Sequence, residues 1–463
     1  MSSRPALRRA CTVLTAALAA GALGGVPAAA IPPPELDQAA TPPPGSAGPV
    51  QPMAQRSPCV VSGVLAGTDP AAVSPNQVSL NLAEAWRHSL GDGQLVAVID
   101  TGVTPGPRLP DVEAGGDFVE STDGRTDCDG HGTLVAGLIA GQPGDDGFSG
   151  IAPAARIVSI RQTSARYAPR DPGEDPALTR AGIDVETLAR AVVRAADLGA
   201  RVITISAVTC LPANKNVDQS ALGAALRYAA VDKDAVIIAA AGDTGTANAV
   251  GTACESNPLS DPARPSDPRN WSGVTSVSVP AWWQPYVLSV GSLGPGGQPS
   301  PTTMAGPWVG VAAPGENIVS VSNADDGALA NGLPGPEGEL TPITGSSYAA
   351  AYVSGVAALV RSRFPDLTAR QVVERITATA HGAARSPSNL VGAGGVDPVA
   401  ALTWRVPDTA AADPAAVRQL AAPPQPAPTD PLPRIVAFGG VGVLALLVLT
   451  VVVVHAKRKD NPS

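Results

Sequence analysis

QLVAVIDTGV, at Gln94–Val103, is the clearest fold signal in the chain, because a short, mostly apolar and β-branched run ends there in Asp-Thr-Gly. Similar apolar runs recur at Ile157–Ile160, Val202–Ser206 and Val236–Ala241. Between them lie segments with helical patterns, at His131–Gly141, Val185–Leu198 and Leu222–Ala230. Apolar strands that alternate with helices indicate a parallel sheet covered on both faces. The sequence therefore predicts a three-layer α/β/α fold with a mostly parallel sheet.

Length and composition limit the number of domains and exclude several classes of protein. The chain has 463 residues, enough for one large domain or two to three small ones, and a formal net charge of -9. The acidic balance argues against nucleic acid as a main partner, because binding phosphates needs clustered Lys and Arg. No internal repeat is apparent, so a solenoid or a propeller is not predicted. The 49 Gly and 48 Pro would suit disorder if evenly spread, but many of the Pro lie near the two ends.

The N-terminus has the layout of a secretory signal. Arg4, Arg8 and Arg9 precede an apolar run from Cys11 to about Leu23, and three small residues end at Ala30. The apolar run is too short for a membrane helix. We predict a signal peptide at residues 1–30, cleaved after Ala30 and followed by an N-terminal extension at 31–81 that begins Pro-rich.

The C-terminal end predicts a membrane anchor. Ile435–Val454 is 20 residues without a charge, long enough to span a hydrocarbon core of about 30 Å. Basic residues follow it, and the positive-inside rule puts them in the cytoplasm. We predict a main domain at 82–405, a Pro-rich linker at 406–433, a transmembrane helix at 434–456 and a cytoplasmic tail at 457–463. The protein is thus expected at the cell membrane, single-pass, with its main domain extracytoplasmic.

Cysteine usage fits an oxidising compartment. Cys11 leaves with the signal, and Cys59, Cys128, Cys210 and Cys254 remain. Four cysteines allow three pairings. Disulfides are favoured over metal binding because the chain has no CxxC motif and no His cluster near the cysteines. No metal and no cofactor is predicted.

Polar residues at strand ends indicate the site. Ligands of parallel α/β sheets bind at the carboxyl ends of the strands, which points to Asp100, to Ser206-Ala207 and to Gly242-Asp243. His131 and Ser347 each follow a glycine-rich turn at the start of a helical pattern. A serine hydroxyl needs a neighbouring base, and that base needs a carboxylate to fix its tautomer.

Each of these three residues alone also has an ordinary structural explanation. A strand-end Asp often forms a turn, and a Ser before an Ala-rich helix is usually a cap. A single His is usually structural. Ser347 at a helix N-terminus would also place its own N–H toward an oxyanion.

Three segments carry a family resemblance. VAVIDTGV (Val96–Val103), DGHGTLVAGLIAG (Asp129–Gly141) and GSSYAAAYVSGVAAL (Gly345–Leu359) are similar, in this order, to the active-site blocks of subtilisin-like serine proteases. The resemblance covers roughly Leu82–Leu402. It implies a subtilisin-like fold and an acyl-enzyme mechanism, with Asp100 as orienting acid, His131 as general base and Ser347 as nucleophile.

The flanking segments resemble the mycosins, membrane-anchored subtilases associated with type VII secretion in actinobacteria. The likeness rests on the signal, the Pro-rich extension, TDCDGHGT around Cys128, SIRQTS at Ser159–Ser164 and the C-terminal helix. It implies the disulfides Cys59–Cys128 and Cys210–Cys254, protein or peptide substrates, and partners in the secretion membrane complex. The extension is too short for a folding pro-domain, so we expect it to wrap the domain and stay attached.

Substrate-facing positions follow from the resemblance alone. Ser206, Ala207, Ala240, Ala241 and Gly242 fall where subtilases pair with an extended peptide and line the first specificity pocket. Tyr167–Leu178 is a polar, Pro-rich insertion, and we expect it to be a surface loop; by the family resemblance, covering the cleft is an alternative role for it.

Two positions depart from the family pattern. Ala351 stands where the family commonly has Pro, and Asp243 stands where it usually has an Asn that donates to the oxyanion. An ionised Asp has no proton to donate. Three interpretations of Asp243 stay open: it is protonated and donates, it is ionised and the enzyme is slow, or the loop is shifted and another group donates.

Two functions remain in competition at this stage. The first is a membrane-tethered serine endopeptidase that processes secreted substrates and supports the secretion complex. The second is a mainly structural subunit of that complex, whose proteolysis is weak or dispensable. The three ordered blocks favour the first, and Asp243 together with the anchor favours the second.

Overall fold

The protein is described from a computed structural model. It describes residues 31–245, 253–259, 261, 263–264, 266–324, 326–335, 338–383 and 387–407, and seven residues between 443 and 451. The predicted signal at 1–30 and tail at 457–463 lie outside these residues, as does most of the predicted linker and transmembrane helix. The described residues between 443 and 451 are helical. Within the described part of the chain, no helix is both long enough and apolar enough to cross a membrane.

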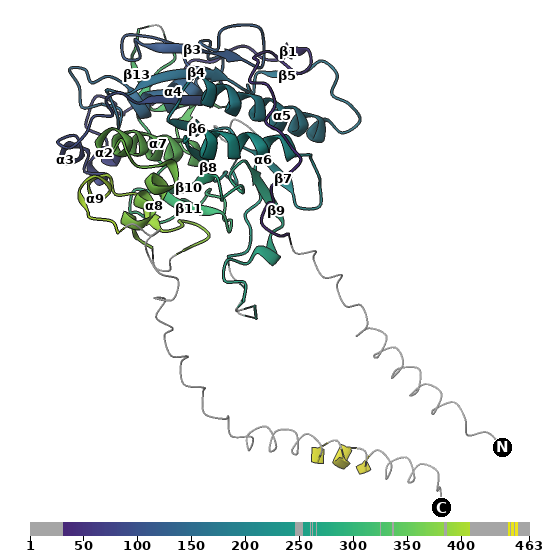
Figure 1. The fold of residues 1–463 in the computed structure, drawn as a ribbon. Helices are drawn as coiled ribbons and strands as arrows, with labels where there is room; N and C mark the ends of the chain where they lie inside the picture. The colour runs from purple at the N-terminus through teal and green to yellow at the C-terminus, as the bar shows by residue number, and fades with distance from the viewer. Residues whose placement is uncertain are drawn as a thin grey trace, which may run out of the picture. The chain divides into compact units, whose positions relative to one another are not determined.

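A mostly parallel sheet forms the centre of the domain (Figure 1). Nine strands of the described chain make it, in the order β16-β17-β11-β10-β8-β6-β2-β4-β3. All neighbours are parallel except β16 and β17. The strands are β2 (Leu95–Asp100), β3 (Val112–Asp117), β4 (Arg156–Arg161), β6 (Val202–Ile205), β8 (Val236–Ala240), β10 (Val287–Leu293), β11 (Val309–Pro314), β16 (His381–Gly382) and β17 (Gly394–Gly395). The predicted fold class is confirmed in its α/β, mostly parallel character.

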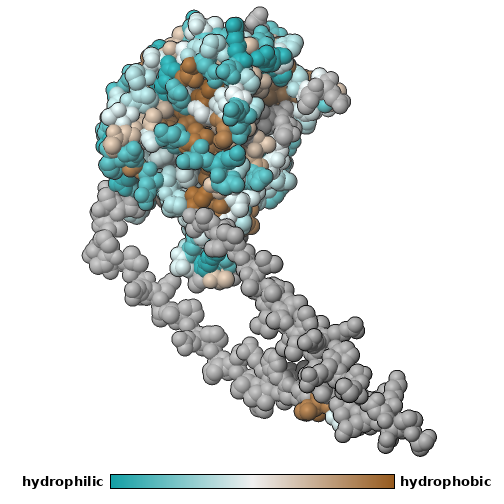
Figure 2. Space-filling view, turned by 90° about the vertical axis from the view of Figure 1, so that its right-hand side faces the viewer, coloured by the Kyte–Doolittle hydropathy of each residue, from teal (hydrophilic) through white to brown (hydrophobic). Residues whose placement is uncertain are grey.

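Helices cover both faces of this sheet. Figure 1 shows α7 (Ser346–Arg363) on one side of the central strands, and α5 (Pro176–Asp197) and α6 (Ser220–Arg227) on the other. Helix α4 (His131–Ala140) packs against α7, and all of its residues are buried. The close packing of α4 depends on small side chains, because Ala and Gly let α4 and α7 approach each other and the sheet closely. Hydrophilic side chains cover most of the outer surface in Figure 2, and hydrophobic ones gather in a central band.

Shorter elements complete the domain and connect the main layers. The helical ones are α2 (Pro75–Ser79), α3 (Leu82–Ala85), the π-helical turn Tyr228–Asp232, the 3-10 turn Trp271–Gly273, α8 (Ala369–Thr379) and α9 (Pro398–Thr403). The extended ones are β1 (Met53–Gln55), β5 (Tyr167–Pro169), β7 (Thr209–Pro212), β9 (Ser276–Val279), β12 (Ser320–Val321), β13 (Leu329–Ala330), β14 (Gly332–Pro334) and β15 (Leu340–Pro342). The last eight lie in four separate antiparallel pairs.

The expectation of a surface loop at Tyr167–Leu178 is wrong at both ends. Tyr167–Pro169 is strand β5, which pairs with β1 of the N-terminal extension. Helix α5 begins at Pro176, where the Asp175 side chain accepts a hydrogen bond from the N–H of Leu178. An N-cap Asp followed by Pro at the first helical position is a strong helix start, and it precedes the predicted start at Val185 by more than two turns.

The N-terminal extension runs along the outside of the domain. In Figure 1 its strand β1 lies at the top beside β5, and its helix α2 lies on the opposite side of the molecule. Between them, the N–H of Val60 donates to the carbonyl of Cys128, and Gly63 forms a bridge with Gly332. The expectation that the extension wraps the domain agrees with these contacts.

Both expected disulfides are present. Cys59 is bonded to Cys128, and Cys210 is bonded to Cys254, with sequence separations of 69 and 44 residues. The first joins the extension to the turn that precedes α4, and the second joins β7 to the segment that follows β8. Each bridge thus connects a peripheral segment to a loop at the carboxyl end of the sheet.

Removing the first bridge tests how strongly the extension is held. The double variant Cys59→Ser, Cys128→Ser frees a long loop in the unfolded chain, so we expect it to lose about 2–5 kcal/mol of unfolding free energy. Urea unfolding of the purified chain measures the loss, with Ser57→Ala as a neighbouring control that leaves the bridge intact. Equal unfolding midpoints for all three proteins would contradict the prediction.

Candidate active site

Three polar side chains from three elements meet at the carboxyl end of the sheet. Asp100 is the last residue of β2, a strand buried along its whole length between β4 and β6. His131 is the first residue of α4, and Ser347 lies in the first turn of α7. The sequence predicted all three as site residues. The structure brings them together although they are far apart in the chain.

The three side chains form a continuous line of hydrogen bonds. His131 Nδ1 lies 2.8 Å from Asp100 Oδ1, and His131 Nε2 lies 3.0 Å from Ser347 Oγ. The N–H of Thr101 donates to the same Asp100 oxygen at 2.7 Å. Asp100 is 0% exposed, His131 1% and Ser347 8%. A hydroxyl, an imidazole and a carboxylate in this order can move a proton off the hydroxyl.

The surroundings of His131 favour its protonated form. Burial alone lowers the pKa of His131, but the charge and hydrogen bond of Asp100, with the charges of Asp127 and Asp129, raise it above the ordinary 6.5. Tyr348 packs with its ring centroid 5.1 Å from that of His131, and burial raises its pKa well above 10. The phenol therefore stays neutral, and the imidazole is surrounded by carboxylates that stabilise its cation.

Two glycines let these elements approach so closely. A Cβ on Gly132 would lie 2.0 Å from the carbonyl oxygen of Gly102, and one on Gly102 would lie 2.1 Å from that of Thr126. Gly102 also has φ +103°, a conformation that other residues rarely adopt. The strand end at Asp100 and the start of α4 are therefore in backbone contact, which fixes the distance between Asp100 and His131.

Asp243 lies beside the start of α7. The N–H of Ser346 donates to both of its carboxylate oxygens, at 3.0 and 2.9 Å, and the Ser346 hydroxyl donates to one of them at 2.8 Å. That hydroxyl also accepts the N–H of Gly242. Burial raises the pKa of Asp243, whereas the Ser346 donors and the charge of His131 oppose the rise. The sequence alone did not indicate Ser346, because its role depends on the loop after β8.

The five predicted substrate-facing residues lie around this site at the ends of β6 and β8. Ser206 and Ala207 directly follow β6, and both side chains are buried. Ala240, Ala241 and Gly242 run from the end of β8 to Asp243 and are buried as well. The N–H of Ala241 donates to Val290, and the carbonyl of Gly242 accepts from Met304, so the chain here is held by its neighbours.

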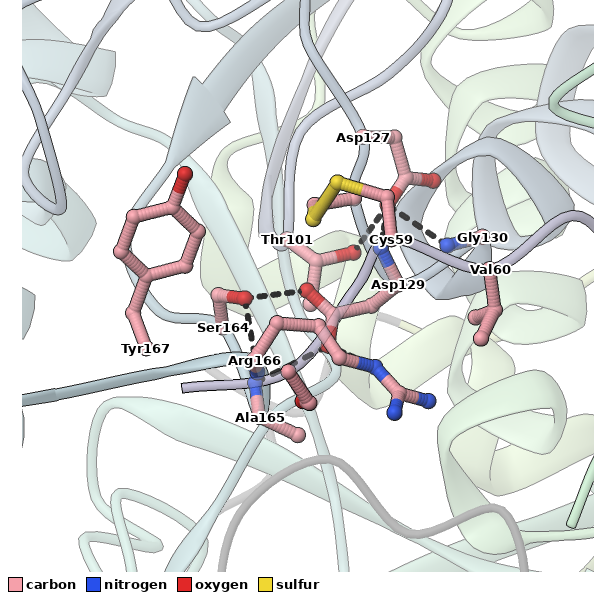
Figure 3. Close-up of polar contacts among 12 residues, drawn as sticks. Cys59, Val60, Thr101, Asp127, Asp129, Gly130, Ser164, Ala165, Arg166 and Tyr167 are labelled. Carbon is pink, nitrogen blue, oxygen red and sulfur yellow. Dashed lines mark hydrogen bonds and ion pairs between the residues drawn. A yellow bond between two sulfur atoms is a disulfide. The ribbon is translucent and has the colours of Figure 1, made fainter. Parts of the chain in front are cut away.

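Two further carboxylates lie beside His131, and the sequence analysis did not single them out. Asp127 and Asp129 precede α4 and are 6% exposed. Figure 3 shows Asp129 beside Ser164, whose hydroxyl donates to it at 2.5 Å, and beside Ala165, whose N–H donates at 3.0 Å. Burial raises the pKa of Asp129 to about 6. Their signal is the segment TDCDGHGT itself, in which both acids stand close before the histidine. Among the residues that the structure describes, no group of His, Cys, Asp and Glu suits a metal ion.

A mostly parallel α/β sheet with a serine, a histidine and an aspartate in line at its carboxyl end is the arrangement of a serine hydrolase. Comparison with known proteins narrows this class. The subtilase family profile matches residues 91–394. Mycosin-3 of Mycobacterium tuberculosis is 61% identical over 459 residues, which are 99% of this chain and 100% of the relative. Mycosin-1 of Mycolicibacterium smegmatis is 46% identical, over 90% of this chain and 94% of the relative.

Solved structures that are similar to this chain lead to the same family. A MycP3 protease from the type VII (ESX-3) secretion system is 72% identical, with a TM-score of 0.78, over 81% of this chain and 100% of that one. A chain of an intact ESX-5 inner membrane complex is 48% identical, with a TM-score of 0.79, over 92% of this chain and 100% of that one. The chain belongs to the subtilase family of serine proteases and, within it, to the mycosins.

Asp129 makes the stability of the fold depend on pH. Its pKa is about 6 in the folded protein and returns to the ordinary 3.8 on unfolding, so the folded state binds the proton more tightly. This stability is fully present below about pH 4 and is lost as the pH rises through about 6. Between pH 4 and pH 7, the unfolding free energy of the unchanged chain should fall by about 2 kcal/mol more than that of Asp129→Asn. Urea unfolding at both pH values measures it, and an equal loss in both proteins would contradict the prediction.

Proposed function

We propose that Ser347, His131 and Asp100 act as nucleophile, general base and orienting acid in the hydrolysis of peptide bonds. The observation that carries the proposal is the line of hydrogen bonds from the Ser347 hydroxyl through His131 to Asp100. Ser347 is 8% exposed, whereas the other two side chains are almost wholly buried, so the hydroxyl is the member of the line that a substrate reaches first.

The geometry supports a two-step reaction. Ser347 Oγ attacks the peptide carbonyl while its proton passes to His131 Nε2, which then gives that proton to the departing amine. A water molecule repeats the sequence on the ester and releases the acid and the serine. In the cationic stage the imidazolium is stabilised by Asp100. Because the surrounding carboxylates raise the pKa of His131 above the ordinary 6.5, the neutral base forms mainly at pH values above 6.5, and activity is expected to rise with pH in that range.

The start of α7 supplies the donor for the developing oxyanion. The first N–H groups of a helix have no partner within the helix. That of Ser346 is taken by Asp243, and we assign the N–H of Ser347 to the oxyanion. All three contacts between Asp243 and Ser346 have the carboxylate as acceptor. This supports the interpretation in which Asp243 is ionised, fixes Ser346, and leaves the enzyme slow for lack of a second donor.

Replacing Asp243 separates the ionised interpretation from the protonated one. If it is ionised, Asp243→Asn adds a donor and removes a repelling charge, so the rate at pH 7 rises by up to about 10²–10³-fold, the effect of one such donor in a subtilisin. The rate of Ser347 labelling by a fluorophosphonate measures this, with the exposed Asp326→Asn as a control that leaves the rate unchanged. A variant no faster at pH 7, with activity that rises toward low pH in the unchanged chain, would support a protonated Asp243 instead.

The wider proposal is an exported protease held at the membrane. We propose that residues 1–30 are a signal, 31–81 an extension, 82–405 the catalytic domain, 406–433 a linker, 434–456 a membrane helix and 457–463 a cytoplasmic tail. The MycP3 protease and the ESX-5 complex support a place in a type VII secretion membrane complex, with secreted proteins or peptides as substrates. The alternative, a mainly structural subunit, is favoured by Asp243 and by the presence of a similar chain in an intact membrane complex.

A fluorophosphonate probe tests the catalytic proposal, because it bonds only to an activated serine. We expect the purified full-length chain to be labelled, and Ser347→Ala and His131→Ala to lose all or nearly all labelling. Ser354→Ala is the matched control, since Ser354 is buried in the same helix and donates only to Ala350 within it. Labelling that persists in Ser347→Ala would contradict the assignment.

A secretion assay separates the two functions in the cell. If proteolysis is the main role, a strain that lacks the protein regains full secretion with the unchanged chain and not with Ser347→Ala. Full restoration by Ser347→Ala would support the structural alternative.

A further inference from the structure

Asp127 is a buried carboxylate that the proposed reaction does not use. It is 6% exposed and lies four residues before His131, in the turn that opens α4. Burial raises its pKa, so the cost of keeping it charged is large and only strong local hydrogen bonding offsets it. The hydrogen-bond partners of this buried carboxylate therefore indicate its role.

Five hydrogen bonds from described residues converge on this carboxylate. One oxygen accepts the N–H of Gly130 at 2.8 Å, the N–H of Asp129 at 3.1 Å and the hydroxyl of Thr101 at 2.8 Å. The other accepts the N–H and the hydroxyl of Thr133, at 2.9 and 2.7 Å. Figure 3 shows the first oxygen between Thr101 and Gly130. Asp127 thus takes up N–H groups on both sides of His131 in the chain.

Thr101 extends this network to the other partner of His131. It directly follows Asp100, and its hydroxyl accepts the N–H of Gly132 at 3.0 Å while donating to Asp127. The strand end that carries Asp100 and the helix start that carries His131 are therefore joined through one hydroxyl and one carboxylate. The backbone contact between Gly102 and Gly132 leaves no space for these two segments to slide.

The extension holds the same turn from outside. The Asn323 amide donates to the carbonyl of Asp127 at 3.2 Å and to that of Val60 at 2.9 Å. Cys128, the next residue, is bonded to Cys59 of the extension. Asp127 is therefore the point at which the strand end, the helix start and the extension are connected.

We infer that Asp127 is a positioning residue for catalysis, which holds His131 and Asp100 in register and adds its charge to those around the imidazole. The inference rests on the proposed function, because it concerns the same nucleophile and base. Asp100, Asp127 and Asp129 face His131 as carboxylates, Asp243 faces it from the loop after β8, and Tyr348 faces it as a neutral phenol. Removing one of these charges lowers the pKa of His131, whereas a purely structural loss leaves it unchanged.

The test compares Asp127→Asn with a matched buried acid in the full-length chain. Asp117, 1% exposed at the end of β3, accepts two N–H groups at 2.7 and 2.9 Å, the hydroxyl of Thr122 and the guanidinium of Arg161. It does not contact Asp100, His131 or Ser347. The readout is the pH dependence of fluorophosphonate labelling of Ser347, corrected for the folded fraction.

We expect Asp127→Asn to label up to about 100-fold more slowly, with the acid limb of its profile shifted to lower pH. Asp117→Asn is expected to lose stability and to keep the rate and the limb of the unchanged chain. An acid limb that does not move in Asp127→Asn, or one that moves equally in Asp117→Asn, would overturn the inference.

A second pair of variants decides the matter if Asp127→Asn does not fold. Thr101→Ala removes the hydroxyl that joins Asp127 to Gly132, and Thr101→Ser keeps it. We expect severalfold slower labelling in the first and recovery in the second, and equal rates would overturn the inference.

If the unchanged chain is not labelled at all, the proposed function is contradicted, but the inference about Asp127 is not yet tested by labelling. In that case the titration of His131, followed by NMR in chain labelled at histidine nitrogen, decides the inference. Asp127→Asn with the same His131 pKa as the unchanged chain would overturn it.

Discussion

The contact between Asp100 and His131 is the constraint on which the rest of the site depends. Both groups are almost fully buried, 2.8 Å apart, and they come from a strand end and a helix start. A buried charge pair tolerates little displacement, because water is not there to replace a lost partner. The two glycines at 102 and 132, the Thr101 hydroxyl and the Asp127 carboxylate all serve to hold these two backbones at one distance. The small-residue helices α4 and α7 then place Ser347 within reach of the same imidazole.

The N-terminal extension and the segment that precedes β5 contact the turn before α4, close to His131. The extension is bonded to Cys128, pairs through β1 with β5, and reaches the carbonyl of Asp127 through Asn323. Strand β5 in turn follows Ser164 and Ala165, which donate to Asp129. The turn before α4 is therefore held by the disulfide to the extension, by Asn323, and by the segment that precedes β5. These contacts join the N-terminal extension to the turn that carries Asp127 and Asp129, the two buried acids beside His131.

Much of this follows from sequence, for a physical reason. Apolar strands and small-residue helices have local patterns, and the blocks around Asp100, His131 and Ser347 are recognisable without any contact being known. The two disulfides were implied only by family resemblance, because four cysteines allow three pairings. The start of α5 was missed because the Pro and polar residues at Tyr167–Leu178 are typical of loops. In the structure, the Asp175 side chain caps the start of α5, and strand β1 pairs with β5 at the other end of this segment. Asp127 and Ser346 were missed because their roles come from contacts with residues distant in the chain.

The central claim is that Ser347 forms a covalent acyl intermediate. Reaction of the full-length chain with p-nitrophenyl acetate, quenched in acid before the ester hydrolyses, traps such an intermediate if it exists. Peptide mass spectrometry then locates the acetyl group. We expect one acetyl group on the peptide that contains Ser347, and none when His131 is replaced by Ala. An acetyl group on another residue, or release of p-nitrophenol with no acetylated peptide, would contradict it.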